Sequence, residues 1–129
     1  MNYYEKAISL GLKSEGAFFN LGMAYGELDR IDDALRAFHN ALEINPNNAD
    51  GHFGLGLCYQ RRVADGMAEK EFLKALEIDS HHTDARLHLS MLYADGGDLQ
   101  KAGEHLRKIL ETDPANERAR KFLRSIERE

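Results

Sequence analysis

The sequence predicts an all-α fold, built as a solenoid of stacked helix-turn-helix units. Two observations lead to this prediction. First, one phrase of the chain is repeated 34 residues later: ALEINPNNADGHFGLGLCY, residues 41–59, matches ALEIDSHHTDARLHLSMLY, residues 75–93. Second, apolar residues within each copy follow helical spacing. At this period the chain divides, without insertion, into units at 15–48, 49–82 and 83–116.

Some columns of the repeat hardly vary between units: leucine recurs at 21, 55 and 89, tyrosine at 25, 59 and 93, and alanine at 34, 68 and 102. In the first unit the apolar spacing predicts one helix over about 18–28 and a second over about 31–42. Glycine inside a helix costs about 1 kcal/mol relative to alanine. We therefore expect Gly22 to face Ala34 or Ala41, so that the two helices can approach closely. Pro46 and Pro114 follow the second helices and separate the units.

These columns resemble the tetratricopeptide repeat, whose signature is reproduced by Phe18, Leu21-Gly22, Tyr25, Ala34, Phe38 and Pro46. The second unit departs from the signature at His52 and Ser80. The third departs at Arg86, Ser90, Leu106 and Ile109. The resemblance covers nearly the whole chain and implies a right-handed α-solenoid whose first helices line its concave side.

The two ends of the single domain predicted over 1–129 differ from the full units. Residues 1–14, with the stretch YYEKAISL, match the later part of a second helix and are expected to form a partial repeat. Residues 117–129 are expected to form a capping helix with a charged outer face. A lone second helix leaves apolar surface uncovered. This favours either a fragment of a longer array or a homo-oligomer that covers the N-terminal end.

Composition argues against several classes of partner. The chain is 43% hydrophobic and 30% charged, with a net charge of −5, which disfavours nucleic acid as a partner. Basic residues on the last helix are interrupted by Glu117, Glu127 and Glu129. The sequence has no apolar run long enough for a membrane span and no visible secretory signal, so the expected location is the cytoplasm. Cys58 is a single cysteine at the margin of the apolar stripe and is expected to be a packed thiol.

A candidate binding site lies on the predicted first helices, in positions that packing within a unit does not require. The expected apolar members are Phe19, Met23, Phe53, Leu57, Leu87 and Met91, and the expected polar rim is Asn20, Glu27, Gln60, Arg61, His88 and Asp95. Such a strip would bind a protein or peptide with spaced apolar anchors. The alternative is that part of the strip packs against the neighbouring unit and belongs to the core.

Two kinds of binding site known from the family that this chain resembles can be compared with the sequence residue by residue. Members that clamp the carboxyl terminus of a chaperone carry Lys, Asn and Arg where this chain has Phe19, Met23, Gly54, Asp84 and His88. Asp84 would repel a carboxylate. If the clamp positions are aligned one unit later along the chain, only Arg118 matches a clamp residue. A sugar-transferring relative has a ladder of asparagines, and of these positions only Asn20 is asparagine here. We therefore expect no chaperone C-terminal carboxylate clamp.

The histidines are the strongest candidates for metal ligands or catalytic residues. His81, His82, Asp84 and His88 are close in sequence, but adjacent histidines at a helix start do not converge easily on one ion. His52 and Arg86 are expected to extend polar tips past an apolar surface. No nucleophile, base and orienting group can be assembled, so we expect no catalysis, no cofactor and no metal. The sequence thus predicts a non-catalytic protein-binding adaptor. The alternatives are a self-associating structural module and, third, a metal-binding or enzyme-associated segment.

Overall fold

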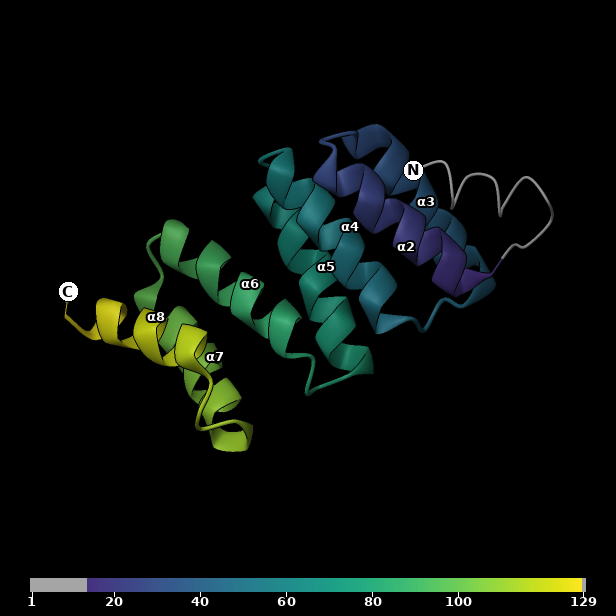
Figure 1. Cartoon of the computed structure of the whole chain (residues 1–129). Coiled ribbons are helices and arrows are strands. Elements are labelled where there is room, and N and C mark those ends of the chain that lie inside the picture. The colour runs from purple at the N-terminus through teal and green to yellow at the C-terminus, as the bar shows by residue number, and fades with distance from the viewer. Residues whose placement is uncertain (1–13, 129) are drawn as a thin grey trace.

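The computed structural model describes residues 14–128, which form seven α-helices and no strands. The helices are α2 (Glu15–Glu27), α3 (Ile31–Ile44), α4 (Ala49–Arg61), α5 (Asp65–Ile78), α6 (Thr83–Asp95), α7 (Leu99–Thr112) and α8 (Glu117–Glu127). Each helix packs against the next one along the chain, and α2 and α8 lie at opposite ends of the array (Figure 1). The predicted all-α repeat solenoid is confirmed. The partial repeat expected over 1–14, and with it the N-terminal surface for self-association, falls almost entirely outside the described residues.

The first helix of each unit begins with a side-chain cap at the same column. Ser14, Asn48, His82 and Asn116 each accept a hydrogen bond from the backbone N–H three residues on, at 3.0, 3.1, 3.0 and 3.0 Å. Such caps satisfy one of the N–H groups that a helix start leaves without a partner. His82 caps through Nδ1, which must be unprotonated to accept, while its Nε2 lies 2.8 Å from Oδ1 of Asp50.

A left-handed residue turns the chain between the two helices of each unit. These residues are Asp29 at φ 60°, Val63 at φ 56° and Gly97 at φ 88°. The N–H of the residue that follows each one donates to the carbonyl of the recurring tyrosine, at 2.9, 2.8 and 2.8 Å. This bond closes the C-terminus of the first helix. The tyrosine backbone thereby helps to set the angle at which the second helix leaves.

Phenylalanine rings on the second helices fill the spaces that the helical glycines leave. A Cβ added to Gly22 would stand 2.7 Å from the Phe38 ring, and one added to Gly54 would stand 2.4 Å from the same ring. Gly56 faces Phe72 in the same way, at 2.4 Å. The expectation that Gly22 faces Ala34 or Ala41 is therefore wrong. Position 22 has room only for glycine because the flat Phe38 ring, and not a small alanine side chain, occupies the space beside it.

Two polar pairs join the helices within the second and third units. His52 lies 3.1 Å from Oε1 of the buried Glu71 and 3.1 Å from the carbonyl oxygen of Pro46. The same columns one unit later hold Arg86, which lies 2.9 Å from His105 Nδ1 and donates to the Ser80 carbonyl at 3.0 Å. The expected polar tips of His52 and Arg86 are thus hydrogen-bonded bridges between helices.

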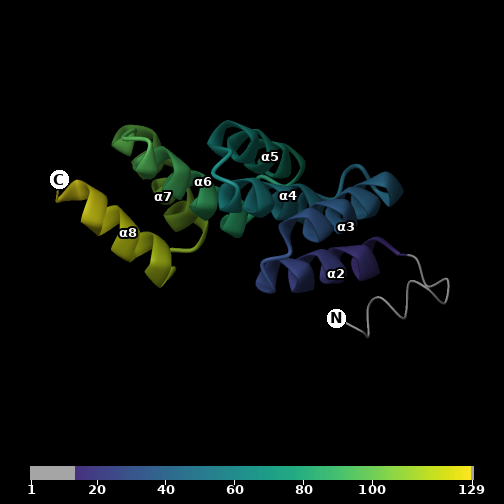
Figure 2. The same ribbon diagram turned by 90° about the horizontal axis from the view of Figure 1, so that it is seen from above.

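The last helix covers the C-terminal end of the core. Ala119 of α8 is fully buried, and the half-buried Phe122, Leu123 and Ile126 pack against a cluster around Leu106. Seen from above, α8 ends the row of helices at the end opposite α2 (Figure 2). Across residues 14–128, no helix combines the length and the apolar character that crossing a membrane requires.

Candidate functional site

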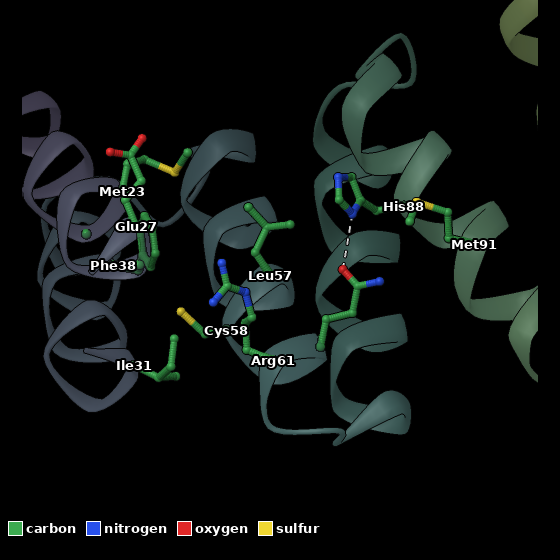
Figure 3. Close-up of a pocket in the computed structure, with 12 residues that line it drawn as sticks. Met23, Glu27, Ile31, Phe38, Leu57, Cys58, Arg61, His88 and Met91 are labelled. Carbon is green, nitrogen blue, oxygen red and sulfur yellow. Dashed lines mark hydrogen bonds between the residues drawn. The ribbon is translucent and has the colours of Figure 1, made fainter. Parts of the chain in front are cut away.

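The first helices α2, α4 and α6 enclose one pocket with a volume of about 400 Å³ (Figure 3). Its floor comprises Gly22, Gly26, Ile31, Phe38 and Cys58, and its walls comprise Met23, Glu27, Leu57, Gln60, Arg61, His88 and Met91. We call this pocket the first-helix groove. Ile31 and Phe38 reach the floor from α3, the partner helix of α2.

One repeat column supplies the apolar wall of the groove. Met23, Leu57 and Met91 occupy equivalent positions on three successive first helices, and all three are half-buried. They come into one site because stacking places the first helices side by side. Methionine is flexible and polarizable and adapts to apolar partners of different shape. This half of the predicted apolar strip therefore lines the groove and stays partly exposed.

The other column of the predicted strip belongs to the core, where it packs against the second helix of its own unit as well as against the next unit. Phe53 is 8% exposed, and its ring lies 5.9 Å from the Phe72 ring and 5.5 Å from the His88 ring. Leu87 is 3% exposed and packs in the cluster with Leu106. The expectation that these two residues are open to a partner is wrong, and the alternative that part of the strip belongs to the core holds for them, because their side chains pack against second helices and the next unit.

Phe19 occupies the same column at the N-terminal end of the described array. Its side chain is half-buried, and its ring lies 5.8 Å from the Phe38 ring, tilted by 54°. It lines a separate, more polar pocket with Glu15, Asn45 and Asp79. Phe19 therefore does not join Met23 in the first-helix groove.

Four of the six predicted rim residues line the groove, namely Glu27, Gln60, Arg61 and His88. Gln60 Oε1 lies 3.1 Å from Nδ1 of His88, which ties α4 to α6. The Arg61 guanidinium donates to Oδ1 of Asp29 at 3.0 Å. Asn20 and Asp95 are exposed but do not line the groove.

Burial determines the charge state of two groups in the groove. It lowers the pKa of His88, the positive charge of Arg118 lowers it further, and Asp84 opposes the shift. His88 is therefore neutral at pH 7. Burial also raises the pKa of Cys58 to about 11, against the opposing effects of Arg62 and Arg61. The thiol stays protonated and forms part of an apolar floor, as expected of a packed cysteine.

Sequence reasoning missed the floor of the groove. Ile31 and Phe38 are core columns of the repeat, which a search for residues not needed by packing passes over. Gly26 offered a weak signal, since it is a glycine in a helix at a column that holds Gln60 and Ala94 in the other units. Only the three-dimensional arrangement shows that this glycine lines the groove beside Ile31 and Phe38.

The histidines considered for a metal site point to different partners. His82 caps α6 and contacts Asp50, whereas His88 contacts Gln60 on α4. His81 is exposed. Within the described part of the chain, no three His, Cys, Asp or Glu side chains gather closely enough to hold a metal ion.

Comparison with known proteins connects this architecture to one family. Two models of the tetratricopeptide repeat match residues 16–48 and 68–126. No curated protein matches the chain. The first tetratricopeptide repeat domain of Spaghetti (RPAP3), solved with the HSP90 peptide SRMEEVD, superposes with a TM-score of 0.82 at 20% identity, covering 88% of this chain and 90% of that one.

Two further solved structures are similar. The tetratricopeptide repeat domain of Arabidopsis OM64 has a TM-score of 0.82 at 18% identity and covers 88% of this chain and 94% of that one. YrrB, described as a tetratricopeptide repeat protein with an unusual peptide-binding site, has a TM-score of 0.77 at 28% identity. The match covers 92% of this chain and 61% of YrrB. The likeness to the RPAP3 and OM64 domains, at 20% and 18% identity, shows a shared fold.

Proposed function

The chain belongs to the tetratricopeptide repeat family, whose domains generally mediate protein–protein interactions, and we propose that it is a non-catalytic adaptor. Its first-helix groove holds a peptide or an amphipathic helix of another protein. The observation that carries this proposal is the joint placement of Met23, Leu57 and Met91 around one pocket of about 400 Å³. That volume lies within the range of about 300–1,000 Å³ typical of ligand sites.

The size of the groove sets the scale of the affinity. An apolar anchor that becomes fully buried contributes about 1.5–3 kcal/mol. The groove has room for few such anchors, and ordering a flexible peptide offsets much of their contribution. We therefore expect a dissociation constant in the micromolar range, on the order of 1 μM.

An acidic C-terminal tail does not suit the surface of the first helices α4 and α6. At position 54 an added Cβ would stand 2.4 Å from the Phe38 ring, so an asparagine donor does not fit there while Phe38 keeps its place. Asp84 adds an exposed carboxylate on α6, and His88 is neutral and bonded to Gln60. We propose that the partner is not a chaperone tail held by its carboxylate.

Selection from a phage-displayed library of random peptides tests the adaptor proposal. Peptides enriched on the wild-type chain are titrated, by fluorescence polarization, against wild type and against Met91→Lys. Lysine keeps a long stem that can lie along the wall while its ammonium group disrupts apolar contact. We expect Met91→Lys to weaken binding at least about tenfold.

The matched control is Met67→Lys. Met67 is 53% exposed on α5 and lies outside the groove, so this variant should bind the same peptides with unchanged affinity. Phe53 and Leu87 are unsuitable for the test because burying a charge at either would unfold the unit. Equal binding by Met91→Lys and wild type would refute the groove as the site. Sedimentation velocity on the same samples shows whether the chain self-associates instead.

A further inference from the structure

Gly26 lines the first-helix groove without a structural reason to be glycine. A Cβ added there would meet no atom within 4 Å, whereas one added to Gly22, Gly54 or Gly56 would strike a phenylalanine ring. Its φ is not positive, since Gly97 is the one described glycine in that region. Glycine in a helix destabilises it relative to other residues. Neither packing nor backbone geometry compensates for that cost at position 26.

The missing side chain has a consequence for the groove. Gly26 lines the groove together with the nearly buried Ile31, Phe38 and Cys58, and no side chain from position 26 fills the space beside them. The equivalent position of the second unit holds Gln60, whose side chain reaches across to His88. Gln60 thus bridges the second and third units. Gly26, at the equivalent position, has no side chain to bridge the first and second units, and the groove is open there.

Glu27 and Arg61 are the acidic and basic residues that line the groove, and they differ in whether their charge is paired. Glu27, next to Gly26, is exposed and has no ion-pair partner among residues 14–128. Arg61, on the opposite wall, is already paired with Asp29 at 3.0 Å. His88 is neutral at pH 7 because burial and Arg118 lower its pKa. The groove thus offers an unpaired carboxylate beside an apolar opening.

We propose that the opening at Gly26 takes one bulky apolar side chain of a bound peptide, and that Glu27 selects a lysine or arginine next to that side chain. This inference rests on the proposed adaptor function and specifies its partner as a basic apolar peptide. Met23 and Met91 adjust to the shape of the anchor, so leucine, methionine and phenylalanine all fit. Complementary charge fixes the register of the peptide and disfavours acidic ones.

The test uses the phage-displayed peptides selected on the wild-type chain and two variants. Gly26→Gln copies the residue at the equivalent position 60 and should weaken binding of these peptides at least about tenfold, while raising the thermal midpoint of the protein. The matched control is Gly66→Gln, a helical glycine of α5 with no atom within 4 Å of an added Cβ and no place in the groove. It should leave binding unchanged.

The charge element is tested by a second selection, on Glu27→Arg. Wild type should enrich lysine or arginine beside the apolar anchor, and Glu27→Arg should enrich aspartate or glutamate at that place. Glu77→Arg, at an exposed glutamate of α5, is the control and should select the same peptides as wild type.

The outcomes separate this inference from the adaptor proposal. Unchanged affinity in Gly26→Gln, or acidic peptides enriched on wild type, would overturn the inference while loss of binding in Met91→Lys still supports a binding groove. The same peptides enriched on Glu27→Arg and on wild type would also overturn it. A library that yields no peptide bound in the groove would refute both.

Discussion

Arg86 donates a hydrogen bond from Nη1 to Nδ1 of His105 across 2.9 Å, and so joins the two helices of the third unit. A guanidinium can only donate, so Nδ1 must be the unprotonated nitrogen. The same two columns hold His52 and Glu71 in the second unit, and Phe18 and Ala37 in the first. The same pair of columns is therefore apolar in the first unit and forms a polar bridge between helices in the second and third.

This bridge makes stability depend on pH. Burial lowers the pKa of His105 below its ordinary 6.5, and Arg86 and Lys108 lower it further. The unfolded chain therefore takes up a proton at a higher pH than the folded one. Unfolding should become easier as the pH falls through about 6.5 toward the folded pKa. His88 has a lowered pKa too and acts in the same direction.

We expect the free energy of unfolding, measured by urea titration and circular dichroism, to fall between about pH 7 and about pH 5. His105→Gln keeps an oxygen acceptor for Arg86 without a titrating ring, so it should flatten this dependence. His39→Gln, at an exposed residue of α3, should keep the wild-type slope. If His105→Gln retains that slope as well, the bridge does not control the response.

Val63 has the strained backbone of the second turn. It adopts φ 56° and is 81% exposed, whereas the equivalent residues are Asp29 and Gly97. The left-handed region costs an L-residue about 1–2 kcal/mol, and branching at Cβ makes it less favourable still. Because Val63 packs against little, replacing it should relieve strain without loss of core contacts.

Val63→Asn should therefore raise the free energy of unfolding by about 1 kcal/mol, since asparagine tolerates this conformation. Chemical denaturation is the measurement. Val63→Thr keeps the branched Cβ while making the side chain polar, and should give no comparable gain. Equal gains from both variants would show that surface polarity, and not backbone strain, governs this position.

The histidine cap of α6 gives a third prediction. His82 accepts from the N–H of Ala85 at 3.0 Å where the first helices of the neighbouring units are capped by Asn48 and Asn116. His82→Ala removes the acceptor and should cost about 1 kcal/mol. His82→Asn restores it and should recover most of that loss in the same denaturation experiment.

The ring of His82 also has contacts besides the cap. It lies 5.0 Å from the Phe53 ring, and Nε2 contacts Asp50. Asp50→Ala removes the Nε2 partner alone and should cost less than the loss of the cap. If His82→Asn is as unstable as His82→Ala, these other contacts are what stabilise the start of α6.

The sequence predicted the fold well because the fold depends on periodic residues. The leucine, tyrosine and alanine columns recur at a constant interval, and the helices follow them from Glu15 through Thr112. Helical periodicity and a repeat length are properties of neighbours along the chain, which a sequence shows directly. Family membership followed from the same columns.

The site was harder to predict because its limits depend on contacts between helices, both within a unit and between units. A helical wheel places Phe53 and Met23 on the same outward face, yet Phe53 packs against Phe72 and His88 while Met23 lines the groove. The wheel of one helix contains no information on where the second helix of the unit and the first helix of the next unit pack against it. The column of Met23, Leu57 and Met91 remains accessible, and the column of Phe53 and Leu87 is covered.

The Phe38 ring and its two glycines yield the last prediction. Gly54→Ala puts a Cβ 2.4 Å from Cε1 of Phe38, which is too close for the ring to stay in place. We expect a net loss of about 1–3 kcal/mol from overpacking, although alanine favours the helix. Gly66→Ala, where an added Cβ meets nothing within 4 Å, should cause no loss.

A double-mutant cycle assigns the loss to the ring. Phe38→Leu removes the outer ring atoms that an alanine at 54 would strike, so Gly54→Ala should cost less in that background than in wild type. The coupling energy between the two sites, measured by urea unfolding, should exceed about 0.5 kcal/mol. Additive effects would mean that the α4 glycine is required by something other than Phe38. The close approach of α4 to α3 would then need another cause.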